Sequence, residues 1–178
     1  MHIRDMTDAN IDSALEIERR AFGEEDEADL VHNLLGDPSA QPALSLLAYQ
    51  DDRAVGHILF TKAHLAQSPV PVSATLLAPL AVVPDAQKQG VGAHLIAHGL
   101  KRLTQDGVDL VFVLGHPDYY PRCGFEPAGR LGFEAPYPIP EMHADAWMVQ
   151  ALRPGVIGSA HGRVQIATAI DKAEYWRE

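Results

Sequence analysis

The sequence predicts an α/β fold with a mixed, mostly antiparallel central sheet and one parallel β-α-β crossover. Three consecutive segments between residues 43 and 83 have the apolar, alternating character of strands. An amphipathic helix over 91–103 follows, and after it comes the uninterrupted apolar run Leu110-Val111-Phe112-Val113-Leu114. Such a run is typical of a strand covered on both faces, and the strand-helix-strand order implies a right-handed crossover between parallel strands.

The elements before the crossover are predicted from caps and periodicity. A short strand is flanked by Ile3 and Met6. Thr7 is expected to cap a helix in which the residues at helical spacing are Ile11, Ala14, Leu15, Ile17 and Glu18. A second short helix ends at Gly36, where glycine favours a helix stop. The meander that follows is expected to be antiparallel and to use three strands: 43–50, 54–64 and 73–83.

The segment beyond residue 129 is rich in proline and glycine. Short strands are expected around 131–134, 146–152 and 163–167. The length predicts one domain over 1–178, with a core of about 1–130 and variable C-terminal strands over about 131–178. Trp147 and Trp176 are expected to pack either on the sheet or against a second copy of the chain in a homodimer, and both alternatives stay open.

Composition and charge exclude several classes of protein. Of the 178 residues, 47% are apolar and the net charge is −10, which disfavours nucleic-acid binding but would attract a cationic acceptor. No apolar run approaches the roughly 20 residues of a membrane span, so a cytoplasmic protein without a membrane partner is expected. Cys123 is the only cysteine, which rules out an intramolecular disulfide and a thiolate metal cage; no metal is predicted.

The loop between the third strand and the amphipathic helix is the strongest candidate for a binding site. It reads Val83-Pro84-Asp85-Ala86-Gln87-Lys88-Gln89-Gly90-Val91-Gly92. A helix start exposes unpaired N–H groups, and the two glycines would let a phosphate approach the backbone. The side chains of Gln87 and Lys88 can add donors. The alternative is that the two glycines serve a tight turn.

The spacing Gln87-x-x-Gly90-x-Gly92 resembles the pyrophosphate-binding motif of the GNAT N-acetyltransferase superfamily. The resemblance covers about residues 1–130, and the run 114–122 is similar to the small bacterial N-acetyltransferases that resemble YhbS. It implies the GNAT fold with splayed strands, and acetyl-CoA as the co-substrate. The residues that the resemblance assigns to acetyl-CoA binding are Ala81, Val82, Val83, Gln87, Lys88, Gln89, Gly90, Val91 and Gly92.

The same resemblance implies direct attack of a primary amine on acetyl-CoA in a ternary complex. A backbone N–H of Ala81, Val82 or Val83 would steady the oxyanion. Tyr120 stands four residues before the Gly124–Phe125 pair and is the implied general acid for the departing thiolate. The acceptor is a small-molecule or peptide amine: a polyamine, an aminoglycoside-like drug, a free amino acid or a protein N-terminus.

The general base is not identified by the sequence. The strand before the loop reads Leu76-Leu77-Ala78-Pro79-Leu80 and offers no carboxylate. A proton acceptor is needed because an amine with a pKa near 10.4 is mostly protonated at neutral pH. The alternatives that stay open are a water chain and the side chains of Glu24, His57, His64 and His116.

Two other signals are interpreted as structural. Cys123 is expected to pack rather than to carry an acyl group. His94 and His98 have metal-ligand spacing, but Leu95 stands where a zinc protease has glutamate, so an outer helix face is expected. Two rivals to acetyl transfer remain. One is a non-catalytic CoA-binding sensor, which the missing strand carboxylate favours, and the other is transfer of a different acyl group, which the pocket size near the thioester would decide.

Overall fold

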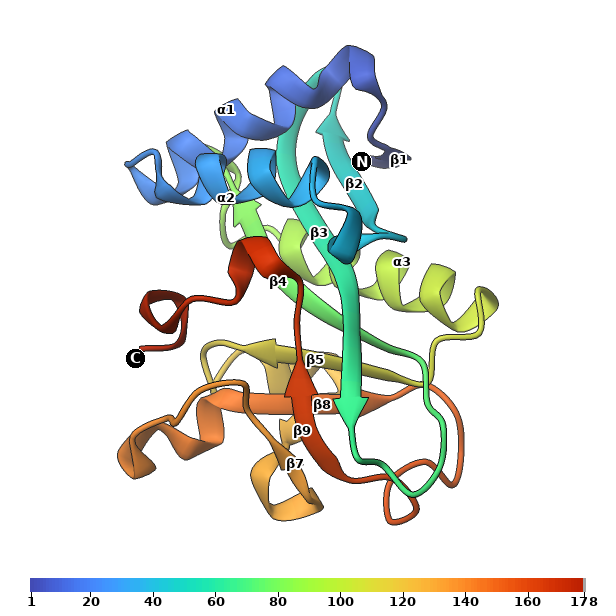
Figure 1. The fold of residues 1–178 in the computed structure, drawn as a ribbon. Coiled ribbons are helices and arrows are strands. Elements are labelled where there is room, and N and C mark those ends of the chain that lie inside the picture. The colour runs from blue at the N-terminus through green and yellow to red at the C-terminus, as the bar shows by residue number, and fades with distance from the viewer. Residues whose placement is uncertain (178) are drawn as a thin grey trace.

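The computed structural model describes residues 1–177 and is built on one twisted sheet (Figure 1). The strand order along it is β1-β2-β3-β4-β5-β8-β6, and only β4 and β5 are parallel on this path. The predicted mixed, mostly antiparallel sheet with one parallel crossover is therefore confirmed. Its strands are β1 (His2–Asp5), β2 (Leu44–Gln50), β3 (Arg53–Ala66), β4 (Ala74–Val82), β5 (Leu110–Leu114), β6 (Glu126–Pro127) and β8 (Trp147–Ala151).

Two short strands lie beside this path. β7 (Phe133–Glu134) pairs in parallel with β9 (Gly162–Gln165), and β9 pairs with the end of β3. The sequence predicted β7, β8 and β9 approximately but not the two-residue strand β6, because two residues carry no readable period.

The helices cover both faces of the sheet. α1 (Ile11–Phe22) and α2 (Asp26–Leu35) lie on one face, and α3 (Val91–Gln105) lies on the other (Figure 1). Neighbouring residues of β3 show this arrangement, because Gly56 contacts Val91 of α3 whereas His57 contacts Glu18 of α1.

The first helix starts one turn later than the Thr7 cap predicts. Thr7 is the N-cap of a 3-10 turn, Asp8–Asn10, and its N–H donates to Asn10 Oδ1 over 2.7 Å. α1 then begins at Ile11.

The parallel strands β4 and β5 separate after three residue pairs. Ala74, Thr75 and Leu76 pair with residues 110–112, while β4 continues to Val82 without a strand on that side. Ala78 and Pro79 form a bulge against β3, where the register shifts and where proline has no N–H to donate to the ladder. The predicted splay is thus present, and it leaves the second half of β4 with one open edge.

Both tryptophans pack inside the chain. Trp147 stacks on Phe112 at 5.3 Å between ring centroids, and Trp176 meets Trp147 edge to face at 5.7 Å. Each tryptophan is only 3% exposed. Of the two alternatives left open by the sequence, packing on the sheet is correct. In residues 1–177 no helix combines the length and the apolar character that crossing a bilayer requires.

Candidate functional site

The loop between β4 and α3 presents a series of unpaired backbone donors. Lys88 and Gly90 have φ values of 62° and 83°, so the chain turns sharply twice before α3 begins at Val91. Within residues 1–177, no N–H group of residues 88–93 donates a hydrogen bond. The first turn of α3 also contains no acidic side chain. This is the arrangement that binds anions at helix N-termini.

The loop is held in place by side chains on both sides. Asp85 accepts two hydrogen bonds from Arg53, at 2.6 and 2.8 Å, and one from Arg20 at 3.3 Å. The Arg53 guanidinium is the main reason that the pKa of Asp85 is lowered to about 2. Gln87 Nε2 donates to Val82 O over 2.9 Å, and Gln89 Nε2 donates to Asp85 O over 3.1 Å.

These contacts separate the roles of the predicted side-chain donors. The Gln87 and Gln89 amides brace the loop against its own backbone. Lys88 is exposed and makes no hydrogen bond or ion pair within residues 1–177, so it can turn to an anion.

The end of β4 offers one open N–H among the three predicted residues. Val83 N–H donates to Val55 O of the β3 side over 2.9 Å. Because N–H groups alternate in direction along a strand, Val82 N–H points away from β3, toward the edge where β5 has separated. Ala81 pairs with His57 and directs its N–H to β3. Val82 is therefore the residue of this set that faces the splay.

Two adjacent tyrosines lie against the start of α3. Tyr120 begins a 3-10 turn, Tyr120–Cys123, and its ring centroid is 5.1 Å from that of Tyr119. The Tyr119 hydroxyl occupies the space that a Cβ at residue 92 would need, so Gly92 lets this hydroxyl lie against the first turn of α3. Tyr119 was missed by the sequence analysis, although it stands next to Tyr120 in the same motif.

Tyr120 is a protonated donor in this environment. Burial raises the pKa of its phenol, and the neighbouring Tyr119 raises it further. The Tyr120 hydroxyl makes no hydrogen bond within residues 1–177, and it is not among the buried polar atoms that lack a partner. The oxygen is therefore accessible to a ligand or to solvent.

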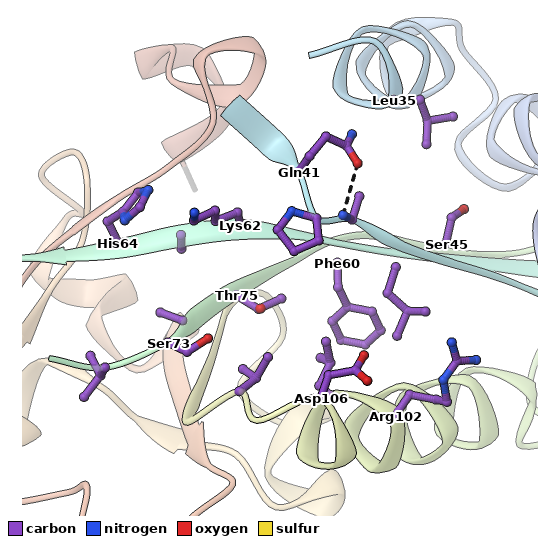
Figure 2. A pocket seen from close by; sticks show the side chains of 18 of the residues that line it. Leu35, Gln41, Ser45, Phe60, Lys62, His64, Ser73, Thr75, Arg102 and Asp106 are labelled. Carbon is purple, nitrogen blue, oxygen red and sulfur yellow. Dashed lines mark hydrogen bonds between the residues drawn. The ribbon is translucent and has the colours of Figure 1, made fainter. Parts of the chain in front are cut away.

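The four candidate bases lie in different places. Glu24 is exposed between α1 and α2, and the backbone carbonyl of His116 accepts the amides of residues 119 and 120 in the turn after β5. His64 lines a cavity of about 890 Å³ at the start of β4 and the end of α3, the opposite end of the sheet from the loop (Figure 2). Only His57 lies beside the end of β4, opposite Ala81.

His57 is part of a buried polar chain that the sequence did not reveal. Its Nδ1 lies 2.6 Å from Glu18 Oε2 and its Nε2 lies 2.8 Å from Ser45 Oγ. The available signal was Glu18, a carboxylate within the otherwise apolar stripe of the first helix. Ser45 gave no signal, because its contact with His57 depends on strand pairing.

The residues interpreted as structural have local partners. His94 Nδ1 lies 2.7 Å from Gly90 O, which fastens the first turn of α3. Burial raises the pKa of the Cys123 thiol, which disfavours the reactive thiolate. Among residues 1–177, no three His, Cys, Asp or Glu side chains are grouped as a metal site would require.

Comparison with known proteins gives consistent matches. Residues 2–128 match the family described as acetyltransferase (GNAT) domain. The uncharacterized N-acetyltransferase YjhQ of Escherichia coli K12 is 54% identical over 152 residues, 85% of this chain and 83% of YjhQ. The uncharacterized N-acetyltransferase YhbS of the same organism is 33% identical over 153 residues, 83% of this chain and 84% of YhbS.

Solved structures agree with the sequence matches. The crystal structure of E. coli YhbS in complex with CoA has a TM-score of 0.86 at 27% identity, over 96% of this chain and 92% of that chain. A GNAT acetyltransferase from Brucella melitensis in complex with acetyl-CoA has a TM-score of 0.75 at 25% identity, over 95% of this chain and 97% of that chain. The fold and these matches thus define an acyltransferase. The chain belongs to the GNAT family of N-acetyltransferases, and it is similar to YhbS.

Proposed function

We propose that this protein transfers an acetyl group from acetyl-CoA to a primary amine by direct attack in a ternary complex. The observation that carries the proposal is the run of unpartnered N–H groups over residues 88–93, next to the open edge of β4. Two similar proteins, YhbS and the Brucella acetyltransferase, were crystallised with CoA and acetyl-CoA respectively. Acetyl-CoA would supply the acetyl group as a thioester.

Each part of the site has a task in this reaction. The amides of the loop and the Lys88 ammonium would hold the pyrophosphate, for which Gly90 leaves room. Val82 N–H would face the carbonyl oxygen as charge develops on it. Tyr120 would donate a hydrogen bond to the departing sulfur, and its raised pKa keeps the proton in place until then.

The acceptor would approach from the face of α1 and α2. The first turn of α2 carries Asp26, Glu27 and Asp29, and the whole chain has a net charge of −10. Both features favour a cationic amine at this face. The chemical class of the acceptor is therefore a protonated amine, which must lose one proton before it attacks.

Two measurements on the purified protein test the proposal. Calorimetry with CoA and acetyl-CoA should show binding, and a thiol-release assay over a panel of polyamines, aminoglycosides, amino acids and peptides should show amine-dependent release of CoA. Binding of acetyl-CoA without release by any amine would instead support a CoA sensor. Faster release of CoA from a longer acyl-CoA would support transfer of a different acyl group.

A further inference from the structure

The cavity at the far end of the sheet has the size of a small-molecule site. Its volume is about 890 Å³, and such sites usually enclose about 300–1,000 Å³. It is bounded by β3 and the start of β4 on one side and by the end of α3 on the other (Figure 2). None of the residues assigned to acetyl-CoA lines it.

The length of α3 separates this cavity from the acetyl-CoA loop. α3 begins beside the loop at Val91, runs for 15 residues and is capped by Asp106, which lines the cavity. A helix of that length spans about 22 Å, because each residue adds about 1.5 Å. A small molecule in the cavity therefore does not reach a thioester held at the loop.

The strand wall of the cavity carries polar side chains that face the same way. Phe60 of β3 lies against Gly99 of α3, so Lys62, two residues further along, points to the same face of the sheet. Thr75 of β4 is registered opposite Lys62 and shares that face. Neither the Lys62 ammonium nor the Thr75 hydroxyl has a hydrogen-bond or ion-pair partner within residues 1–177.

The hydroxyl of Thr75 opens on the cavity although the residue is buried. Thr75 is 6% exposed, yet its oxygen is not among the buried polar atoms of residues 1–177 that lack a partner. The accessible part of this side chain therefore includes the hydroxyl. In native proteins such a group is completed by water or by a ligand. His64 and Ser73 line the same cavity and add further polar groups.

The helix wall of the cavity carries a free negative charge. Asp106 forms no ion pair with any residue from 1 to 177. Arg102 also lines the cavity, but its guanidinium donates to both carboxylate oxygens of Asp5, over 2.6 and 3.0 Å. In Figure 2, Arg102 and Asp106 come from the helix, whereas Lys62 and Thr75 come from the strands. One cation and one anion thus line the same cavity without pairing with each other.

An apolar surface accompanies these charges. The Phe60 ring lies between β3 and α3, and Leu44 is registered opposite Phe60 (Figure 2). Leu103 and Val108 add apolar side chains from the end of α3 and the loop after it. An inorganic ion would leave this surface unused. A ligand that uses all of the cavity needs charged groups of both signs and an apolar body.

We propose that this cavity binds a zwitterion with an apolar body, of the class of a free amino acid with a large apolar side chain. Lys62 and Thr75 hold the carboxylate by charge-assisted hydrogen bonds, and Asp106 accepts from the ammonium. The apolar side chain lies against Phe60. The net charge of −10 repels a simple anion but not a zwitterion. This site does not depend on the proposed acetyl transfer.

Three probes that share one ring separate the two charges. Calorimetry in the absence of acetyl-CoA should show binding of L-phenylalanine. Both 3-phenylpropanoate, which lacks the ammonium, and 2-phenylethylamine, which lacks the carboxylate, should bind about tenfold or more weakly. Equal binding of either analogue would refute a zwitterion site. So would the absence of binding by L-phenylalanine, L-leucine and L-tryptophan at millimolar concentration.

Variants test the assigned side chains. Lys62→Met and Asp106→Asn should each weaken L-phenylalanine binding about tenfold or more, because each removes one charged partner. Lys101→Met removes an exposed lysine of α3 that does not line the cavity and should leave this affinity unchanged. All three variants should keep the wild-type Tm and CoA affinity. Unchanged L-phenylalanine affinity in either Lys62→Met or Asp106→Asn would overturn the proposal.

NMR on ¹⁵N-labelled protein distinguishes this site from an acceptor site. L-Phenylalanine should shift the amide resonances of residues 60–64 and 73–75 and leave those of residues 88–92 unchanged. Shifts confined to residues 80–92 would mean that the amino acid binds as an acceptor, and would refute the second site. Because acetyl-CoA is absent, a failure of acetyl transfer does not alter this result, and a failure of the second site leaves acetyl transfer standing.

Discussion

Gly90 joins two requirements in one residue, a positive φ of 83° and a backbone open to an anion. Gly90→Asp would place a negative side chain beside the free amides and strain the left-handed turn. We expect the Kd for CoA, measured by calorimetry, to rise more than about 100-fold, which corresponds to about 2.7 kcal/mol.

Gly107 provides a matched control for this change. It has nearly the same φ, 85°, at the other end of α3, and nothing lies within 4 Å of its Cβ position. Gly107→Asp adds the same charge and the same backbone strain away from the loop, so CoA affinity should stay near the wild-type value. Retained affinity in Gly90→Asp would contradict the assignment of the loop.

Tyr120 differs from its neighbour in what its hydroxyl can reach. Tyr120→Phe should lower kcat by roughly 10²-fold with little change in acetyl-CoA affinity, because only the donor to the departing sulfur is removed. Steady-state kinetics with calorimetry separates the two quantities. Tyr119→Phe is the comparison, since the Tyr119 hydroxyl lies against Gly92, and it should change acetyl-CoA affinity more than kcat.

The raised pKa of Tyr120 also fixes the sign of a pH effect. The phenol acts in its protonated form, so activity that depends on it is lost only as pH rises through its pKa. Burial moves that pKa above the ordinary value of 10.0. A pH–rate profile should therefore show no loss due to Tyr120 up to pH 10, and a Tyr120-dependent fall near pH 8 would exclude this role.

At the scale of the elements, the ion pairs of Asp85 with Arg20 and Arg53 hold the loop against α1 and β3. Asp85→Asn removes the charge that two arginines hold and should weaken CoA binding about 2- to 5-fold, because exposed ion pairs contribute little. The effect should fade at high salt. Glu134→Gln breaks another exposed pair, with Arg163 at 2.8 Å, far from the loop in sequence, and should leave CoA affinity unchanged.

The pH dependence of this tie follows from the lowered pKa. A carboxyl whose pKa falls to about 2 in the folded state contributes fully above its ordinary value of 3.8, and the contribution is lost as pH falls through about 2. Between pH 5 and 9 the ion pairs of Asp85 should therefore add no pH dependence to CoA affinity. Calorimetry at three pH values checks this, and a loss at pH 5 in wild type that Asp85→Asn removes would contradict it.

Elements that repeat a hydrophobic pattern over many consecutive residues were predictable from the sequence. Elements that depend on contacts between distant residues were not. The stripe of α3 and the apolar run of β5 each carry their structure in consecutive residues, so both were located correctly. β6 has two residues, and the bulge at Ala78–Pro79 depends on pairing with β3. Neither leaves a local pattern to read.

The same distinction applies to the candidate site: residues that are consecutive in the sequence could be proposed, and residues joined only by the fold could not. The residues of the loop are consecutive, so the Gln87-x-x-Gly90-x-Gly92 spacing was enough to propose them as a binding site from the sequence alone. The chain of Glu18, His57 and Ser45 joins residues 39 and 12 positions apart in sequence. Only the pairing of β2 with β3 and the docking of α1 bring these three side chains together.

In the whole molecule, the C-terminal segment closes over the strands that follow the crossover. The aromatic series Phe112, Trp147 and Trp176 runs from β5 through β8 to the last 3-10 turn. Trp176 also donates from Nε1 to Ile170 O over 3.2 Å. The preceding 3-10 turn, Thr168–Ile170, contacts α2.

Trp176→Ala should therefore destabilise the entire fold rather than only its end. The residue is 3% exposed, and removing a buried tryptophan costs about 3–5 kcal/mol. For a chain of this size that lowers Tm by about 6–20 °C, measurable by calorimetry or circular dichroism. Met142→Ala, at a side chain 84% exposed, should change Tm little. If Trp176→Ala also left Tm unchanged, the C-terminal segment would not belong to the cooperative unit, because a buried side chain inside that unit cannot be lost without cost.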